Sequence, residues 1–86
     1  MTVIINGTVH RFTAHGYRRF VQRALPRLGK SEGEITRAQM LRLAHEGVKG
    51  LYFVWATDDD GTLALVTVKR NKPRLEIYLD LKGMRR

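Results

Sequence analysis

The order of apolar and polar residues predicts strands at both ends of the chain and helices between them. Thr2–Ile5 and Thr8–Phe12 are rich in β-branched residues, and they flank the dipeptide Asn6-Gly7. Both positions of a tight hairpin turn require positive φ, which makes Asn-Gly the strongest short hairpin signal. We therefore expect the chain to open with a β-hairpin over residues 2–12.

An amphipathic segment follows this hairpin. From Tyr17 to Leu28, apolar residues recur every three or four positions, which is the helical period. Thr13 is placed to cap the helix, because its hydroxyl can accept a hydrogen bond from the first turn. Pro26 is expected to end or kink the helix near Leu25. A polar loop over residues 29–34 then leads to a second helix.

The second helix has a marked beginning. Thr36 and Gln39 fit a capping box, in which each side chain bonds to the backbone of the other residue. We expect this helix to run from Arg37 to about Glu46. Gly47 is expected to be its left-handed C-cap.

The C-terminal part of the chain predicts a three-stranded antiparallel meander. Residues 51–57 are apolar on both faces, which is typical of a central strand. Residues 58–61 (Asp-Asp-Asp-Gly) are expected to turn the chain into a strand over 62–70. Residues 74–81 alternate apolar and polar side chains, which predicts a third strand with one exposed face.

Together these elements predict a single α+β domain over residues 1–86. It has an N-terminal β-hairpin, two α-helices and then the meander, with the helices packed on one face of the sheet. Residues 82–86 are expected to form a basic C-terminal tail. No apolar run approaches the roughly 20 residues of a membrane span, and no secretory signal pattern is present. We therefore expect a cytoplasmic protein without a membrane partner.

Composition changes this picture in two ways. The chain contains no cysteine, which excludes a disulfide framework and a thiolate metal site. Sixteen Lys and Arg oppose eight Asp and Glu, for a formal net charge of +8. Such a charge favours nucleic acid or an acidic protein as the partner. Arginine, whose planar fork of donors matches phosphate, outnumbers lysine.

The candidate chemistry lies on the polar face of the first helix. His15, Arg19 and Arg23 are spaced four residues apart, so a helix stacks them on one face. Histidine is the usual general acid or base near neutral pH, and arginine stabilises the charge that builds on phosphorus. We predict these residues as catalytic for a phosphodiester. The alternative is a solvated polar face, which every amphipathic helix must have.

Other basic and aromatic side chains are predicted to contact nucleic acid. Lys69 and Arg70 end a strand and point to opposite faces, and Tyr78 lies on the polar face of the third strand, where it can stack on a base. The alternative for the strand ends is charge that keeps a sheet edge soluble. The predicted nucleic-acid contacts are Arg18, Lys69, Arg70, Arg74, Tyr78, Arg85 and Arg86.

No cofactor or metal is expected. A metal site needs three or four ligands at suitable spacing, and the sequence offers no such set. His10 and His45 lie on different elements, and we expect both to be surface residues. The aspartates at residues 58–60 lack the later acidic ligands of a calcium loop, so they are interpreted as a turn.

These residues also resemble a known family. The chain resembles the RelE and ParE superfamily of small basic toxins, in particular BrnT-like domains, in the order of its elements: a strand, two helices and three strands. The resemblance also rests on the run His15-x-x-x-Arg19-x-x-x-Arg23, on the helix end at residues 41–47 and on the strand Leu65–Val68. The resemblance implies a metal-independent endoribonuclease that acts on RNA, with an acidic antitoxin protein as a partner.

Two further hypotheses stay open at this point. ParE-like members of the superfamily bind another enzyme, so the protein is alternatively a non-catalytic binder of nucleic acid or of an acidic host protein, as phage and mobile-element inhibitors are. A structural subunit that pairs through its sheet edge is the third possibility.

Overall fold

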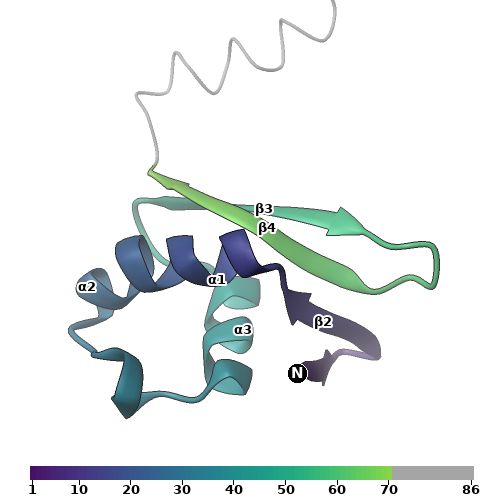
Figure 1. Ribbon diagram of the computed structural model, residues 1–86, viewed down its shortest axis with the longest axis horizontal. Helices are drawn as coiled ribbons and strands as arrows, with labels where there is room; N and C mark the ends of the chain where they lie inside the picture. Colours follow the sequence, from purple (N-terminus) through teal and green to yellow (C-terminus); the bar gives the residue numbers. More distant parts are fainter. Residues whose placement is uncertain (71–86) are drawn as a thin grey trace, which may run out of the picture.

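The computed structural model describes residues 1–70 (Figure 1). The predicted strand over 74–81 and the predicted tail over 82–86 lie outside the described residues. The N-terminal hairpin is confirmed: β1 (Thr2–Ile5) and β2 (Thr8–Phe12) pair antiparallel. Asn6 and Gly7 have φ angles of 52° and 82°, as a two-residue turn between such strands requires.

The first helical region continues past Pro26 in three segments. These are α1 (Ala14–Arg19), a π-helical turn η1 (Phe20–Ala24) and α2 (Leu25–Leu28). In an α-helix the proline ring would collide with the carbonyl group four residues earlier. Here the Leu25 N–H bonds to the Phe20 carbonyl, five residues back, so the turn before the proline is widened. Pro26 was expected to end or kink the helix near Leu25: the helix does not end there, but its regular α-helical geometry is interrupted directly before the proline.

A glycine ends this helical region three residues after the proline. Gly29 has a left-handed conformation with φ 67°. The N–H groups of Gly29 and Lys30 bond to the carbonyls of Pro26 and Leu25 at 3.2 and 3.1 Å. This pair of bonds is the Schellman arrangement, in which glycine avoids the steric cost of positive φ.

The second helical region begins as the sequence predicts. After a short 3-10 turn, η2 (Glu32–Glu34), the helix α3 runs over Arg37–Glu46. Both bonds of the capping box between Thr36 and Gln39 are present. At the other end, Gly47 has φ 98° and ψ 150°, so its φ is positive but its backbone is not left-handed helical as expected.

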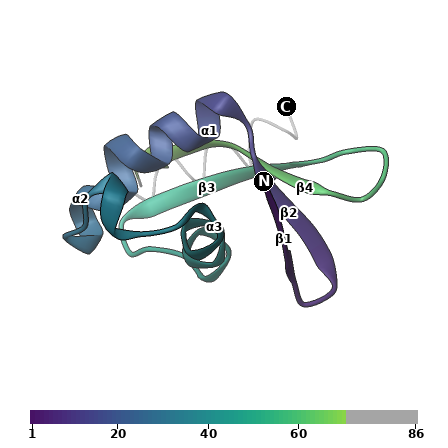
Figure 2. The same cartoon turned by 60° about the horizontal axis from the view of Figure 1, so that its bottom comes forward.

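The sheet is mixed, and this corrects the predicted architecture. The strands β3 (Leu51–Thr57) and β4 (Leu63–Arg70) form an antiparallel hairpin. β4 also pairs in parallel with β2, giving one four-stranded sheet of order β1-β2-β4-β3. Parallel pairing is possible because a long connection separates β2 from β4: the helices lead to Leu51, opposite the end of β4, and β3 then returns the chain to the start of β4. Figure 2 shows the β1–β2 hairpin projecting away from the β3–β4 hairpin.

The strand expected at the centre of the sheet is at its end within the described residues. β4 lies between β2 and β3, whereas β3 pairs only with β4 in residues 1–70. Tyr52 in β3 is 54% exposed, so one face of this apolar strand is open to solvent. The apolar run that suggested a central strand instead reflects packing of the other face on the core.

The core joins both helical regions to the β3–β4 hairpin. It contains three side chains from η1 and α2, two from α3 and three from the strands; these are Phe20, Ala24, Leu25, Met40, Ala44, Leu51, Leu65 and Val68. Burying such side chains is the main favourable contribution to folding. Among the helices of residues 1–70, none has the length and apolar character to cross a membrane.

Candidate nucleic-acid interface

The candidate site is built on the start of α1, which is fixed directly to β4. The parallel ladder between β2 and β4 ends at the pair Phe12 and Leu65. Thr13 extends it by one bond, because its N–H donates to the Leu65 carbonyl at 3.1 Å. The Thr13 hydroxyl donates to the same carbonyl at 2.9 Å and accepts from the Gly16 N–H at 2.9 Å. The strand therefore passes into the helix without a flexible linker.

Gly16 lets the helix approach the backbone of the strand. It is buried, and a Cβ atom added there would lie 1.9 Å from the Leu65 carbonyl oxygen. No side chain fits in that space unless the helix moves away from the strand, so the close approach requires glycine. With this side of α1 against β4, the opposite side faces solvent (Figure 1).

The structure keeps the predicted catalytic residues on the helix but gives the two arginines intramolecular partners. His15 is exposed on α1. Arg19 and Arg23 are half-buried: the Arg19 guanidinium donates to the Gln22 side-chain oxygen at 2.6 Å, and the Arg23 guanidinium donates to the Val68 carbonyl at 2.8 Å. Each bond uses one nitrogen of a group that has five N–H donors. Arg19 and Arg23 are therefore held in place while keeping further donors.

The bond from Arg23 brings the helix to the basic end of β4. Val68 is followed directly by Lys69 and Arg70, which are both exposed. Their cross-strand partners are Tyr52 and Leu51, so the two cations lie on opposite faces of the sheet, as expected. The other predicted contacts, Arg74, Tyr78, Arg85 and Arg86, lie outside the described residues.

Charge is distributed unevenly around this helix. Residues 14–28 contain four arginines and no acidic residue. We call the arginine-bearing side of this region, which runs from the exposed Arg18 through Arg19 to Arg23 at the border with β4, the arginine strip. The acidic residues of the described chain lie elsewhere, in the turn between β3 and β4, in η2 and at the end of α3; they are Asp58, Asp59, Asp60, Glu32, Glu34 and Glu46. Asp58 is paired with Arg11 at 3.0 Å.

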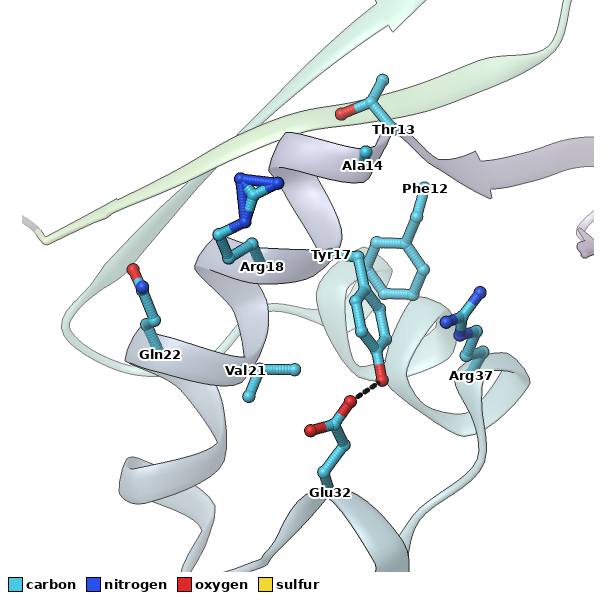
Figure 3. A pocket seen from close by; sticks show the side chains of 9 residues that line it. All are labelled: Phe12, Thr13, Ala14, Tyr17, Arg18, Val21, Gln22, Glu32 and Arg37. Carbon is cyan, nitrogen blue, oxygen red and sulfur yellow. Dashed lines mark hydrogen bonds between the residues drawn. The ribbon is translucent and has the colours of Figure 1, made fainter.

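A pocket of about 590 Å³ lies beside the arginine strip (Figure 3). Its floor and walls come from β2, α1, η1, η2 and α3. The Tyr17 hydroxyl donates a hydrogen bond to the Glu32 carboxylate, and the Arg37 guanidinium lies 4.2 Å from the centre of the Tyr17 ring. The lining residues are Phe12, Thr13, Ala14, Tyr17, Arg18, Val21, Gln22, Glu32 and Arg37.

The hydrogen bond to Glu32 sets the protonation of Tyr17. It raises the pKa of Tyr17 above its ordinary value, because the carboxylate favours the protonated phenol. Desolvation raises this pKa as well, whereas the Arg37 guanidinium acts in the opposite direction. Tyr17 is therefore a hydrogen-bond donor at neutral pH.

Sequence reasoning missed this pocket. Tyr17 follows the helical period of the apolar residues, and the pattern therefore predicts it as one of them. The sequence does contain one indication of a polar partner here. Tyr17 occupies a position that leucine or phenylalanine would usually fill, and a phenol at the edge of a core needs a hydrogen-bond partner. Glu32 and Arg37 come from a loop and from another helix, so no spacing in the sequence connects them to Tyr17.

The prediction that His10 is a surface residue is wrong. His10 is 1% exposed, and its ring lies edge-on to those of His45 and Trp55, with centroid distances of 5.2 Å to each. Its Nδ1 lies 2.8 Å from the Thr8 carbonyl. Burial of His10 could have been inferred from the two-residue period of a strand, because this period places His10 on the same side of β2 as the apolar residue Phe12. Within residues 1–70, no three His, Asp or Glu side chains are grouped to hold a metal ion.

Comparison of the chain with family models, with curated proteins and with solved structures finds no match. The resemblance to the RelE and ParE superfamily therefore stays a prediction.

Proposed function

We propose that the protein binds RNA along the arginine strip. The observation that carries this proposal is the position of the strip: residues 14–28 carry four arginines and no acid, and the Arg23 bond to Val68 joins them to Lys69 and Arg70. At about 1.5 Å per residue, the helical region is about 20 Å long. Such a row of cations matches the row of phosphates in a single strand of RNA.

The held arginines favour phosphate binding over a merely solvated face. A free arginine loses side-chain entropy when it binds a ligand. Arg19 and Arg23 have already lost part of it through their bonds to Gln22 and to the Val68 carbonyl. Because their guanidinium groups are already oriented, binding a phosphate costs less side-chain entropy, and a larger part of the interaction free energy contributes to affinity.

Cleavage of the bound RNA is the second candidate, and the position of His15 favours it. His15 is exposed one turn before Arg19 on the same helix. As a general base, the imidazole would take the proton of a 2′-hydroxyl, whose oxygen then attacks the adjacent phosphorus. The bond from phosphorus to the 5′-oxygen breaks, water protonates that oxygen, and a 2′,3′-cyclic phosphate remains. Arg19 and Arg23 would stabilise the charge on the phosphorane, without metal or cofactor.

The binding proposal is tested by titrating a labelled single-stranded RNA in EDTA at several salt concentrations. We expect the affinity to fall with salt, and Arg19→Gln and Arg23→Gln each to lower the slope of log K against log salt by about 0.7. Arg42→Gln, which removes an exposed cation from α3 instead, is the matched control and should change the slope little. Equal slopes for all three variants would contradict binding along the strip.

The same RNA, analysed on a denaturing gel, separates binding from cleavage. If the protein is an endoribonuclease, the wild type cuts the RNA in EDTA, and His15→Ala binds it with unchanged affinity but does not cut. RNA that is bound but intact with both proteins would reject catalysis. RNA that is not bound even at low salt would reject the RNA proposal and favour an acidic protein partner.

A further inference from the structure

The pocket beside the arginine strip has the composition of a ligand site. Phe12, Ala14 and Val21 give it apolar walls, and Tyr17, Glu32 and Arg37 place polar groups on one side (Figure 3). Small-molecule sites are mostly apolar with a few placed polar groups, and their volumes are about 300–1,000 Å³. The volume of about 590 Å³ lies in this range.

Two of its polar groups are flat and already face one another. The Arg37 guanidinium lies 4.2 Å from the centre of the Tyr17 ring. Tyrosine rings and guanidinium planes are the groups on which proteins stack unpaired nucleobases. The hydrogen bond from the Tyr17 hydroxyl to Glu32 fixes the orientation of the ring. The pocket therefore offers an oriented stacking surface beside a row of cations.

The Glu32 carboxylate adds a preference among bases. An ionised carboxylate only accepts hydrogen bonds, and its two oxygens together have about four lone-pair positions, of which Tyr17 uses one. Guanine presents two adjacent donors, N1–H and the N2 amino group, on its Watson–Crick edge. Adenine and cytosine place an amino group beside an acceptor nitrogen, and uracil places N3–H between two carbonyls. Guanine is thus the base whose edge matches a carboxylate at both positions.

We propose that this pocket binds a guanine base of the RNA strand that lies along the arginine strip. The proposal rests on the proposed function for the strand, and it adds the base that is recognised. Arg18 belongs to both places, because it lines the pocket and is exposed on α1. A strand whose phosphate contacts Arg18 can thus turn one base into the pocket, where the base stacks on the outer side of the Tyr17–Arg37 pair and Glu32 accepts its two donors.

The test compares three oligouridines that carry one central guanosine, inosine or adenosine. Inosine lacks the N2 amino group of guanosine, so it loses one hydrogen bond to a charged acceptor. We expect the guanosine oligomer to bind about tenfold more tightly than the inosine oligomer. Glu32→Gln should abolish this ratio, because the amide replaces one acceptor with a donor. Glu46→Gln removes the same charge from the end of α3, outside the pocket, and should preserve it.

A titration with guanosine 5′-monophosphate, followed by NMR, separates this proposal from the RNA proposal. The Val21 methyl and Tyr17 ring signals of the wild type should shift, and those of Glu32→Gln should shift much less. If all three oligomers bind equally and with the expected salt dependence, the guanine proposal is overturned and RNA binding stands. If no oligomer binds but the nucleotide shifts Val21 in a Glu32-dependent manner, the base pocket is supported and the strip proposal fails.

Discussion

At the scale of single residues, two residues determine where the arginine strip lies. Gly16 allows α1 to touch the backbone of β4, and Thr13 bonds to the same Leu65 carbonyl. Neither residue carries charge, and only Thr13 lines the pocket. They matter because any displacement of α1 relative to β4 would move every arginine that the helix carries.

The first prediction concerns Gly16. In Gly16→Ala the new Cβ would lie 1.9 Å from the Leu65 oxygen, so the helix must move away from the strand. We expect the free energy of unfolding to fall by about 3 kcal/mol, because overpacking against backbone is relieved only by displacing an element. Urea denaturation measures this change.

The matched control is Gly33→Ala in η2, where an added Cβ meets no atom within 4 Å. This variant is expected to change the stability by less than about 0.5 kcal/mol. A Gly16→Ala protein as stable as Gly33→Ala would show that α1 does not approach β4 as closely as described.

At the scale of elements, the direct passage from β2 into α1 is the distinctive feature. The Thr13 hydroxyl caps the helix through the Gly16 N–H and also bonds to the Leu65 carbonyl of β4. One side chain thus satisfies a donor of the helix and an acceptor of the strand. Because Thr13 serves both the helix end and the sheet, we expect a change at this residue to destabilise the start of α1 and its attachment to β4 together.

The second prediction follows from this shared residue. Thr13→Ala removes both bonds, and we expect it to lower the free energy of unfolding by about 1–2 kcal/mol. Thr13→Ser keeps the hydroxyl and is expected to stay within about 0.5 kcal/mol of the wild type. Thermal unfolding of both variants tests this, and equal losses for alanine and serine would assign the effect to the lost methyl group instead.

Elements defined by neighbouring residues were predictable from the sequence. Asn6-Gly7 specifies its hairpin, and Thr36 with Gln39 specifies the start of α3, because each signal acts over four residues or fewer. The widened turn before Pro26 was not predictable. Both an ended helix and a π-helical turn remove the clash, and packing of Phe20 and Ala24 in the core decides between them.

The rest of the fold and site depends on residues far apart in the chain. The parallel pairing of β2 with β4 joins residues about fifty positions apart, such as Phe12 and Leu65, and no local pattern records it. The polar face with His15, Arg19 and Arg23 was visible because helical spacing is local. The pocket was hidden because Tyr17, Glu32 and Arg37 come from three different elements.

At the scale of the whole molecule, the strand order makes protection from solvent unequal. β4 pairs on both sides, with β2 and with β3, whereas β1 pairs only with β2 within the described residues. Ile4 of β1 is 63% exposed, and Leu65 and Val68 of β4 are fully buried. Local opening needs least free energy where few apolar groups are buried.

The third prediction is therefore a gradient of hydrogen exchange across the sheet. Amides of β4 that bond to β3 are expected to exchange only on global unfolding, and amides of β1 are expected to exchange through local opening at much lower free energy. Native-state exchange followed by NMR measures both. Equal protection in β1 and β4 would contradict the strand order, because it would require an additional partner for β1.

The parallel pair between β2 and β4 also has a consequence for biosynthesis. The arginine-rich helix leaves the ribosome early, but the strand that positions it, Leu63–Arg70, is made last among the described elements. Until then α1 lacks its contact at Gly16, and Arg23 lacks the Val68 carbonyl. A nascent chain thus carries its cations without the assembled arginine strip, and under the proposed function ordered binding of RNA would begin only after β4 emerges.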